Sequence, residues 1–241
     1  MMDKLLDIAG VGGTVVLILL LALSVISVGI IIERFIYFRR RRVDAVKLAK
    51  DVLAKLASDD REGLIAQLEK MPSIEAAALA EALAWYDDGP DAFQEILKKG
   101  ITERRKDFEG GLVFLGTLGN NAPFVGLFGT VLGIIVAFRE LSSAAANVAG
   151  GSGNMNNVMA GIAEALVSTA VGILVAVPAV IFFNIFQKKT VQIDDNASAL
   201  GNAVTAHMQR GRGEAAAAAL AEGSAPTPRE SRRSMPVEAE A

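Results

Sequence analysis

Several residue types that build enzyme sites are missing from this chain. It contains no cysteine, which excludes disulfides, thiolate metal sites and cysteine nucleophiles. Its single histidine, His207, lies in a polar segment near the C-terminus, so neither a histidine metal cluster nor a Ser-His-Asp triad is available. Strand signals are also missing, since no alternating run of β-branched residues meets a hairpin dipeptide. We therefore expect a chain built from helices that lacks these metal and nucleophilic sites.

Charge is scarce in three long stretches of the sequence. Hydrophobic residues make up 52% of the 241 residues, and three apolar segments reach the roughly 20 residues that a transmembrane helix needs. The first segment is longer than the apolar part of a signal peptide, lacks a small-x-small cleavage site and ends in arginines, so we interpret it as a membrane span. The three segments are 11–32, 122–141 and 159–186.

Lysine and arginine are distributed unevenly around these spans. Of the 24 such residues, 14 fall between Arg39 and Lys106 and seven follow the third span, whereas segment 142–158 has none. The positive-inside rule then predicts that residues 39–110 and the C-terminus face the cytoplasm, while the N-terminus faces outside. We interpret the run Arg39–Arg42 as a topology determinant that contacts anionic lipids, not as a nucleic-acid site.

The region between the first two spans has helical periodicity. Apolar residues recur at helical spacings through residues 43–58, and two further helical patterns follow, separated by "MPS" and "DDGP". After Pro90 the pattern predicts one long helix that continues into the second span. The chain is therefore predicted to be an all-α membrane protein with three transmembrane helices and long cytoplasmic helical extensions.

The predicted organisation follows from the spans and the charges. It comprises 1–38 (periplasmic N-terminus and first transmembrane helix), 39–110 (cytoplasmic helical domain), 111–141 (second transmembrane helix), 142–158 (periplasmic loop), 159–187 (third transmembrane helix), 188–210 (cytoplasmic helix extension) and 211–241 (disordered tail). The tail is rich in alanine, proline and glutamate, which favours disorder after a short alanine helix.

The second and third spans each carry a stripe of small residues. Steps of three and four place these residues on one face of each helix, and such faces let helices pack closely in lipid. Close packing is the simplest interpretation of the glycines. The stripes are Gly126, Thr130, Gly133 and Ala137, with Gly129 adding a GxxxG, and Ala165, Thr169, Gly172 and Ala176.

Polar side chains interrupt the two apolar spans at defined depths. At about 1.5 Å per residue, Thr130 and Thr169 lie roughly 15 Å below the outer ends of their helices, near the midplane of a core about 30 Å thick. Glu164 lies only about 8 Å below that surface. An ionisable group at such depth indicates function. Two alternatives to function remain open. Glu164 sits at the membrane interface or pairs with Arg139, and the threonine hydroxyls bond to carbonyls of their own helices, as membrane threonines often do.

Apart from Glu164, the sequence places no acid, base or histidine deep within the spans. A complete proton path therefore needs a group from another chain. Pro178 is expected to kink the inner half of the third span.

The same two spans resemble a known family. "APFVGLFGTVLGIIVAF" followed by "GIAEALVSTAVGILVAVPAVIFFNIF" is similar to the paired signature of the MotA/TolQ/ExbB proton-channel family, in particular its ExbB and TolQ branch. The resemblance implies a homopentamer whose second and third spans line a pore around a dimer of an ExbD/TolR-like single-span protein. That partner carries a membrane aspartate. By motif position, Thr130 and Thr169 face this aspartate, Glu164 is the acid at the outer end of the pore, and Pro123 and Pro178 match the family's prolines.

The resemblance also implies a function. It predicts an inner-membrane proton-channel (stator) subunit that uses the proton motive force to drive envelope energy transduction, such as biopolymer or nutrient transport. Such a subunit makes and breaks no covalent bonds, so we expect a non-enzyme without metal or cofactor. A TonB/TolA-like transducer is a further candidate partner, and membrane lipids surround the spans. The alternatives are the stator of a surface-motility (gliding) motor, a non-conducting structural scaffold, and a transporter that works without a partner. An intramembrane hydrolase lacks the histidine or paired aspartates it needs.

Overall fold

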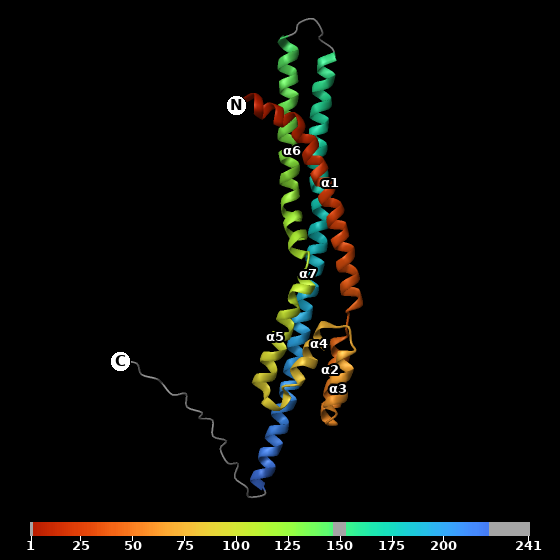
Figure 1. Cartoon of the computed structure of the whole chain (residues 1–241), viewed down its shortest axis with the longest axis vertical. Helices are drawn as coiled ribbons and strands as arrows, with labels where there is room; N and C mark the ends of the chain where they lie inside the picture. The colour runs from red at the N-terminus through yellow and green to blue at the C-terminus, as the bar shows by residue number, and fades with distance from the viewer. Residues whose placement is uncertain (1, 147–152, 222–241) are drawn as a thin grey trace, which may run out of the picture.

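Three long helices dominate the molecule. The computed structural model describes residues 2–146 and 153–221, with side chains for 12–142 and 158–214. Within these ranges the regular elements are all helical, and α1 (Met2–Arg40), α6 (Leu112–Ala146) and α7 (Gly153–Ala221) run side by side (Figure 1). Each of the three contains a stretch long and apolar enough to cross a membrane. The predicted all-helical fold with three spans is confirmed.

Shorter helices form a second unit against the distal half of α7 (Figure 1). Side-chain oxygens of Asp44, Asp60 and Ser73 accept backbone N–H groups at three helix starts, which replaces hydrogen bonds that a helix cannot make to itself. We call this unit, with the part of α7 it contacts, the charged domain. Its helices are α2 (Ala45–Ala57), α3 (Arg61–Glu69), α4 (Ile74–Leu83) and α5 (Pro90–Glu109), with the 3-10 helix η1 (Tyr86–Asp88) before α5.

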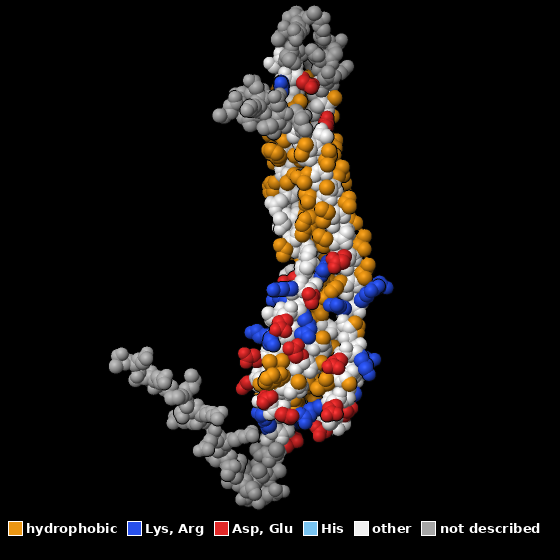
Figure 2. All heavy atoms as spheres, in the orientation of Figure 1, with side chains coloured by type: hydrophobic (Ala, Val, Ile, Leu, Met, Phe, Trp, Pro, Cys, Tyr) orange, Lys and Arg blue, Asp and Glu red, His pale blue; other side chains and the backbone are white. Residues whose placement is uncertain are grey.

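The chain has two apolar cores, and α7 belongs to both. In the charged domain, Leu200 and Val204 of α7 are buried with residues of α2, α3, α4 and α5. In the spans, Val175 and Ala179 of α7 are buried with residues of α1 and α6. Figure 2 shows an apolar surface where α1, α6 and the first half of α7 lie together, and many charged side chains on the charged domain below it. We call the end of the spans away from the charged domain the far end.

The predicted single helix from Pro90 into the second span is wrong. The helix breaks at Gly110–Gly111, where Gly111 has φ +72°, a conformation that favours glycine. Arg34 of α1 stabilises this break, because its Nη1 donates a hydrogen bond of 2.6 Å to the carbonyl oxygen of Asp107 in the last turn of α5. Carbonyls at a helix C-terminus have no partner inside the helix. The arginine therefore joins the first span to the elbow where the second begins.

Helices also extend beyond their predicted ends. The predicted loop 142–158 is too long, because α6 continues to Ala146 and α7 begins at Gly153. The predicted tail from residue 211 overlaps the end of α7, which reaches Ala221. Alanine-rich sequence explains the extensions that end at Ala146 and Ala221, since alanine has the highest helix propensity. Residues 147–152 and 222–241 of those two predicted segments lie outside the described residues. The helix runs through Pro178 without a break.

A buried carboxyl group joins the charged domain to α7. Glu75 of α4 is 3% exposed, and Asn196 of α7 donates a hydrogen bond of 3.1 Å from Nδ2 to its Oε1. Burial raises the pKa of Glu75 above its ordinary value of 4.5. The folded chain therefore holds this proton to a higher pH than the unfolded chain does. Its contribution to stability is greatest at acidic pH and falls as the pH rises from 4.5 through the folded-state pKa.

Changing Glu75 to glutamine is expected to stabilise the chain at neutral pH. The amide oxygen of glutamine still accepts from Asn196, and no charge is desolvated. Melting temperatures of the detergent-solubilised chain, measured from pH 4 to pH 8, check this: the gap between variant and parent should widen as the pH rises. Glu69→Gln, at an exposed glutamate of α3, is the control. A gap that stays constant with pH would show that the carboxyl is not the cause.

Candidate functional site

The two stripes of small residues bring α6 and α7 into backbone contact. A Cβ atom added to Gly126 would lie 2.7 Å from the carbonyl oxygen of Ser168. One added to Gly172 would lie 2.7 Å from the carbonyl oxygen of Ala122. Real Cβ atoms essentially never come within 3.0 Å of another heavy atom, so a larger residue at either position forces the helices to move. The helices meet here as small-residue faces allow in lipid.

The contact continues toward the far end. An added Cβ on Gly129 would lie 2.8 Å from the side chain of Ser168, and one on Gly133 would lie 2.6 Å from that of Ala165. Ser168 is 2% exposed and is buried in this contact. The remaining alanines of the stripes, Ala137 and Ala176, are also buried.

This register fixes the depths of the polar residues. Gly129 contacts Ser168, and Thr130 and Thr169 follow these two residues in sequence, so the two threonines lie at one level of the helix pair. Glu164 is five residues before Thr169 on α7, which places it about 7.5 Å nearer the far end. The acid and the two hydroxyls are therefore arranged in series along the α6–α7 contact.

The two threonine hydroxyls differ in their hydrogen bonding. Thr130 is buried, and its Oγ1 donates a bond of 2.7 Å to the carbonyl oxygen of Leu127 in its own helix. Among the described residues, the Thr169 hydroxyl is the one buried side-chain group without a hydrogen-bond partner. Leaving a buried polar group unsatisfied costs about 1–3 kcal/mol. The Thr169 hydroxyl can therefore still donate and accept hydrogen bonds.

Glu164 lies at a small cavity among the three spans. The cavity has a volume of about 60 Å³ and is lined by Thr14 of α1, Gly133 of α6 and Ser168 of α7, among others. The Glu164 side chain is exposed at this level of the single chain. The ion pairs of the described residues include none to Glu164, so pairing with Arg139 does not account for it. A carboxylate at this depth needs water or another chain as its partner.

Apolar faces on both sides of the threonines are uncovered within the chain. They continue along α6 and α7 for several turns, where small residues occupy the helix contact and large ones point away from it. In lipid these faces are covered by acyl chains or by helices of other subunits. They include Phe124, Phe128, Val131 and Phe138 of α6 and Leu166, Leu174, Val177 and Ile181 of α7.

Both prolines of the family signature lie inside the long helices, as the sequence predicts. Pro123 follows Ala122, whose carbonyl oxygen faces Gly172. Pro178 is exposed on α7. In the part of the chain that is described, no group of three or more His, Cys, Asp or Glu side chains is arranged to hold a metal ion.

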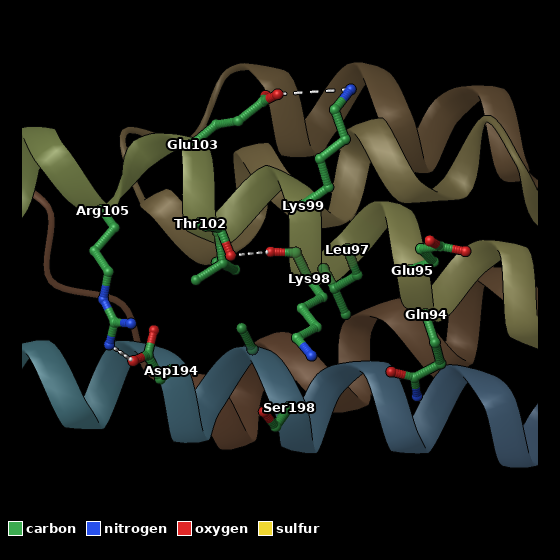
Figure 3. Close-up of a pocket in the computed structure, with 12 residues that line it drawn as sticks. Gln94, Glu95, Leu97, Lys98, Lys99, Thr102, Glu103, Arg105, Asp194 and Ser198 are labelled. Atoms are coloured by element: carbon green, nitrogen blue, oxygen red, sulfur yellow. Dashed lines mark hydrogen bonds and ion pairs between the residues drawn. The ribbon is translucent and has the colours of Figure 1, made fainter.

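A larger cavity is separate from this site. It has a volume of about 870 Å³ and lies between α5 and α7 in the charged domain (Figure 3). Its ionic side chains include pairs across and along the helices: Arg105 donates to Asp194 at 2.6 Å, and Lys99 pairs with Glu103 at 3.6 Å. The Arg105–Asp194 bond joins α5 to α7, and the Lys99–Glu103 pair lies within α5.

Some residues of the α6–α7 contact were missed from the sequence. Gly116 and Gly119 continue the glycine face toward the charged domain, where added Cβ atoms would lie 3.1 Å from Phe183 and 2.5 Å from Val180. Gly161 lies against Ala137 at the far end, with ordinary spacing of 3.5 Å. A sequence signal for these glycines existed, because they continue the helical steps of three and four along each span. It was overlooked because the residues of α7 that face Gly116 and Gly119 are large and do not extend the small-residue stripe.

Comparison with known proteins identifies similar sequences. The model of the MotA/TolQ/ExbB proton channel family matches residues 67–199. The Tol-Pal system protein TolQ of Pseudomonas aeruginosa is 34% identical over 124 residues, 52% of this chain and 47% of that protein. Biopolymer transport protein ExbB of Pseudomonas putida is 32% identical over 152 residues, 62% of this chain and 44% of that protein. The chain thus spans just under half the length of these two relatives.

A third relative is covered more completely. Putative biopolymer transport protein ExbB-like 3 of Synechocystis sp. is 31% identical over 176 residues, which is 73% of this chain and 81% of that protein. The matched region of the family model contains α6, the α6–α7 contact and the first half of α7.

Proposed function

Because the chain belongs to the MotA/TolQ/ExbB proton channel family, we propose that it is a proton-channel subunit that uses the proton motive force to drive transport across a cell envelope. The chain is a multi-pass membrane protein with three apolar helices. Members of the family include proteins of the Tol-Pal system and of biopolymer transport. The family is one of channels rather than of enzymes.

One observation carries the proposal: the buried hydroxyl of Thr169 has no hydrogen-bond partner among the described residues. It lies at the level of Thr130 and below Glu164, on the contact of the two helices that the family signature covers. A hydroxyl can rotate to serve a donor or an acceptor that approaches it. A carboxyl group on another chain would satisfy it.

The inner half of the path supports the need for a second chain. Between the threonine level and the charged domain, residues 112–129 and 170–187 contain no acid, base or histidine. Protons therefore need a carrier that this chain does not supply. We propose an ExbD/TolR-like single-span protein with a membrane aspartate, present as a dimer inside a homopentamer of this chain. The uncovered apolar faces of α6 and α7 supply contact area for such an assembly.

The proposed orientation follows the distribution of basic residues. The charged domain and the C-terminus face the cytoplasm, because 14 of the 24 Lys and Arg residues lie between Arg39 and Lys106 and seven follow the third span. The far end, which carries Glu164, then lies on the periplasmic side of the inner membrane.

The mechanism uses the series of polar groups. A proton enters at the far end, passes Glu164 and neutralises the partner's aspartate beside Thr169 and Thr130. Moving one charge across the membrane supplies about 2.3 kcal/mol per 100 mV. Neutralisation removes a charge interaction in the pore and lets the partner dimer shift between discrete positions before it releases the proton to the cytoplasm. The partner's periplasmic part then performs the work.

Cysteine cross-linking tests the proposed pore. The chain has no cysteine, so Thr169→Cys introduces a single thiol. A cysteine scanned through the partner's span should form a disulfide with it next to the aspartate. Val25→Cys on α1, where Val25 is 74% exposed, is the matched control and should form none. Equal cross-linking from both positions, or none from Thr169→Cys, would contradict a partner in an α6–α7 pore and favour a structural scaffold.

A further inference from the structure

Basic side chains of two helices converge where the spans meet the charged domain. Arg39 lies in the last turn of α1, Arg42 follows that helix, and Lys189 projects from α7 beside them. Within the described residues, no carboxylate forms an ion pair with any of these three side chains. Figure 2 shows basic side chains at this boundary between the apolar and charged surfaces. The boundary is where the phosphates of one lipid leaflet lie.

An apolar cavity opens beside these cations. It has a volume of about 200 Å³, and Phe35 and Phe38 of α1 line it together with Ile185 and Phe186 of α7. Phe38 stacks on Phe186 with ring centroids 5.6 Å apart, which makes a firm base. Phe35 is 53% exposed and Ile185 46% exposed, so the cavity opens toward the side of the spans. Its shape and chemistry fit a hydrocarbon chain.

A polar cavity lies on the other side of the same cations. It has a volume of about 320 Å³ and shares Phe38, Arg42 and Lys189 with the apolar one. Lys189 donates from Nζ to Gln192 at 2.9 Å, which holds its ammonium group at this cavity.

The two carboxylates of the polar cavity are engaged elsewhere. Asp44 accepts the backbone N–H groups of Val46 and Lys47, and Glu75 accepts from Asn196. The cations therefore remain available to an added anion.

We propose that this groove is a binding site for an anionic phospholipid. Arg42 and Lys189, with Arg39 at the rim, hold the phosphate, one acyl chain lies along Phe35 and Ile185, and the rest of the headgroup enters the polar cavity. A free phosphate shares the charge but has no part that fits the apolar cavity. The inference does not depend on proton conduction. The topology decides only which leaflet supplies the lipid, and in the proposed orientation this is the cytoplasmic leaflet.

Native mass spectrometry of the detergent-solubilised full chain tests the site. The chain is titrated with dioleoyl phosphatidylglycerol, with dioleoyl phosphatidylcholine and with inorganic phosphate. Phosphatidylglycerol should bind more tightly than phosphatidylcholine, and phosphate should not displace it. The double variant Arg42→Gln/Lys189→Gln should weaken phosphatidylglycerol binding about 25-fold, since each basic group near a lipid surface contributes about five-fold.

Neighbouring cations provide the matched control. Arg40 and Lys188 are exposed and line neither cavity, so Arg40→Gln/Lys188→Gln should change binding less than about two-fold while removing the same charge. Lys189→Arg, which keeps the charge, should retain binding and shows that the fold is intact. Equal losses in the two double variants, equal binding of both lipids, or displacement by phosphate would overturn the proposal.

Discussion

Changing Thr169 to valine is expected to slow proton transfer through the assembled complex by about ten- to a hundred-fold, the loss that follows from removing a hydrogen bond of about 1.5–3 kcal/mol to a charged group. Valine has nearly the shape of threonine and lacks its hydroxyl. The Thr169 hydroxyl is buried and makes no hydrogen bond within the described part of its own chain. The valine variant therefore loses no hydrogen bond that stabilises the subunit by itself. Proton uptake into liposomes that contain the chain and its single-span partner is the measurement.

Two variants separate this effect from packing. Thr169→Ser keeps the hydroxyl and should retain most of the flux, although it removes a methyl group. Thr130→Val should have the smaller effect on proton transfer, because the Thr130 hydroxyl already donates to Leu127. Flux that survives Thr169→Val, or that falls more with serine than with valine, would show that the hydroxyl takes no part.

Changing Gly172 to alanine is expected to disrupt the α6–α7 contact and lower the melting temperature of the chain. The new Cβ would lie 2.7 Å from the carbonyl oxygen of Ala122 and 3.1 Å from the Cα of Gly126, and neither backbone atom can move without its helix. Overpacking of this kind costs about 1–3 kcal/mol. We expect a cost near the upper end of this range because the clash is with backbone atoms, so the gain of about 1 kcal/mol in helix propensity offsets only part of it. Displacement of α7 also separates Thr169 from Thr130, so transport should fall too.

Gly161→Ala is the matched control on the same helix. Its Cβ would lie 3.5 Å from that of Ala137, an ordinary van der Waals contact. Thermal unfolding of both variants in detergent, followed by circular dichroism, should show a lower melting temperature for Gly172→Ala alone. If both variants melt like the parent chain, the helices are not in direct backbone contact at Gly172.

Much of the fold follows from patterns that one helix can produce by itself. Long apolar runs predict spans, because a helix in lipid needs a fixed length of hydrocarbon-compatible side chains. Helical periodicity, with the breakers between the segments, predicts the short helices of the charged domain, because these signals are local. The break at Gly110–Gly111 was missed although the Gly-Gly pair is itself a local turn signal. What the sequence could not give is the hydrogen bond from Arg34, 73 residues before Asp107, that stabilises the break.

The candidate site was predictable in part for the same reason. Helical spacing alone gives the faces of the two spans and the level of Glu164 above the threonines. The difference between the two threonines was not predictable, since it depends on rotamers and on what surrounds each hydroxyl. Thr130 makes the bond to its own helix that membrane threonines often make, and Thr169 does not.

Proton uptake into liposomes tests the central claim most directly. The chain is reconstituted alone and together with a single-span partner that carries a membrane aspartate, and an imposed potential drives uptake. We expect uptake only from the combined sample, and we expect it to be lost in Glu164→Gln and in Thr169→Val. Equal uptake by the chain alone, or unchanged uptake by both variants, would contradict a path along α6 and α7 that another chain completes.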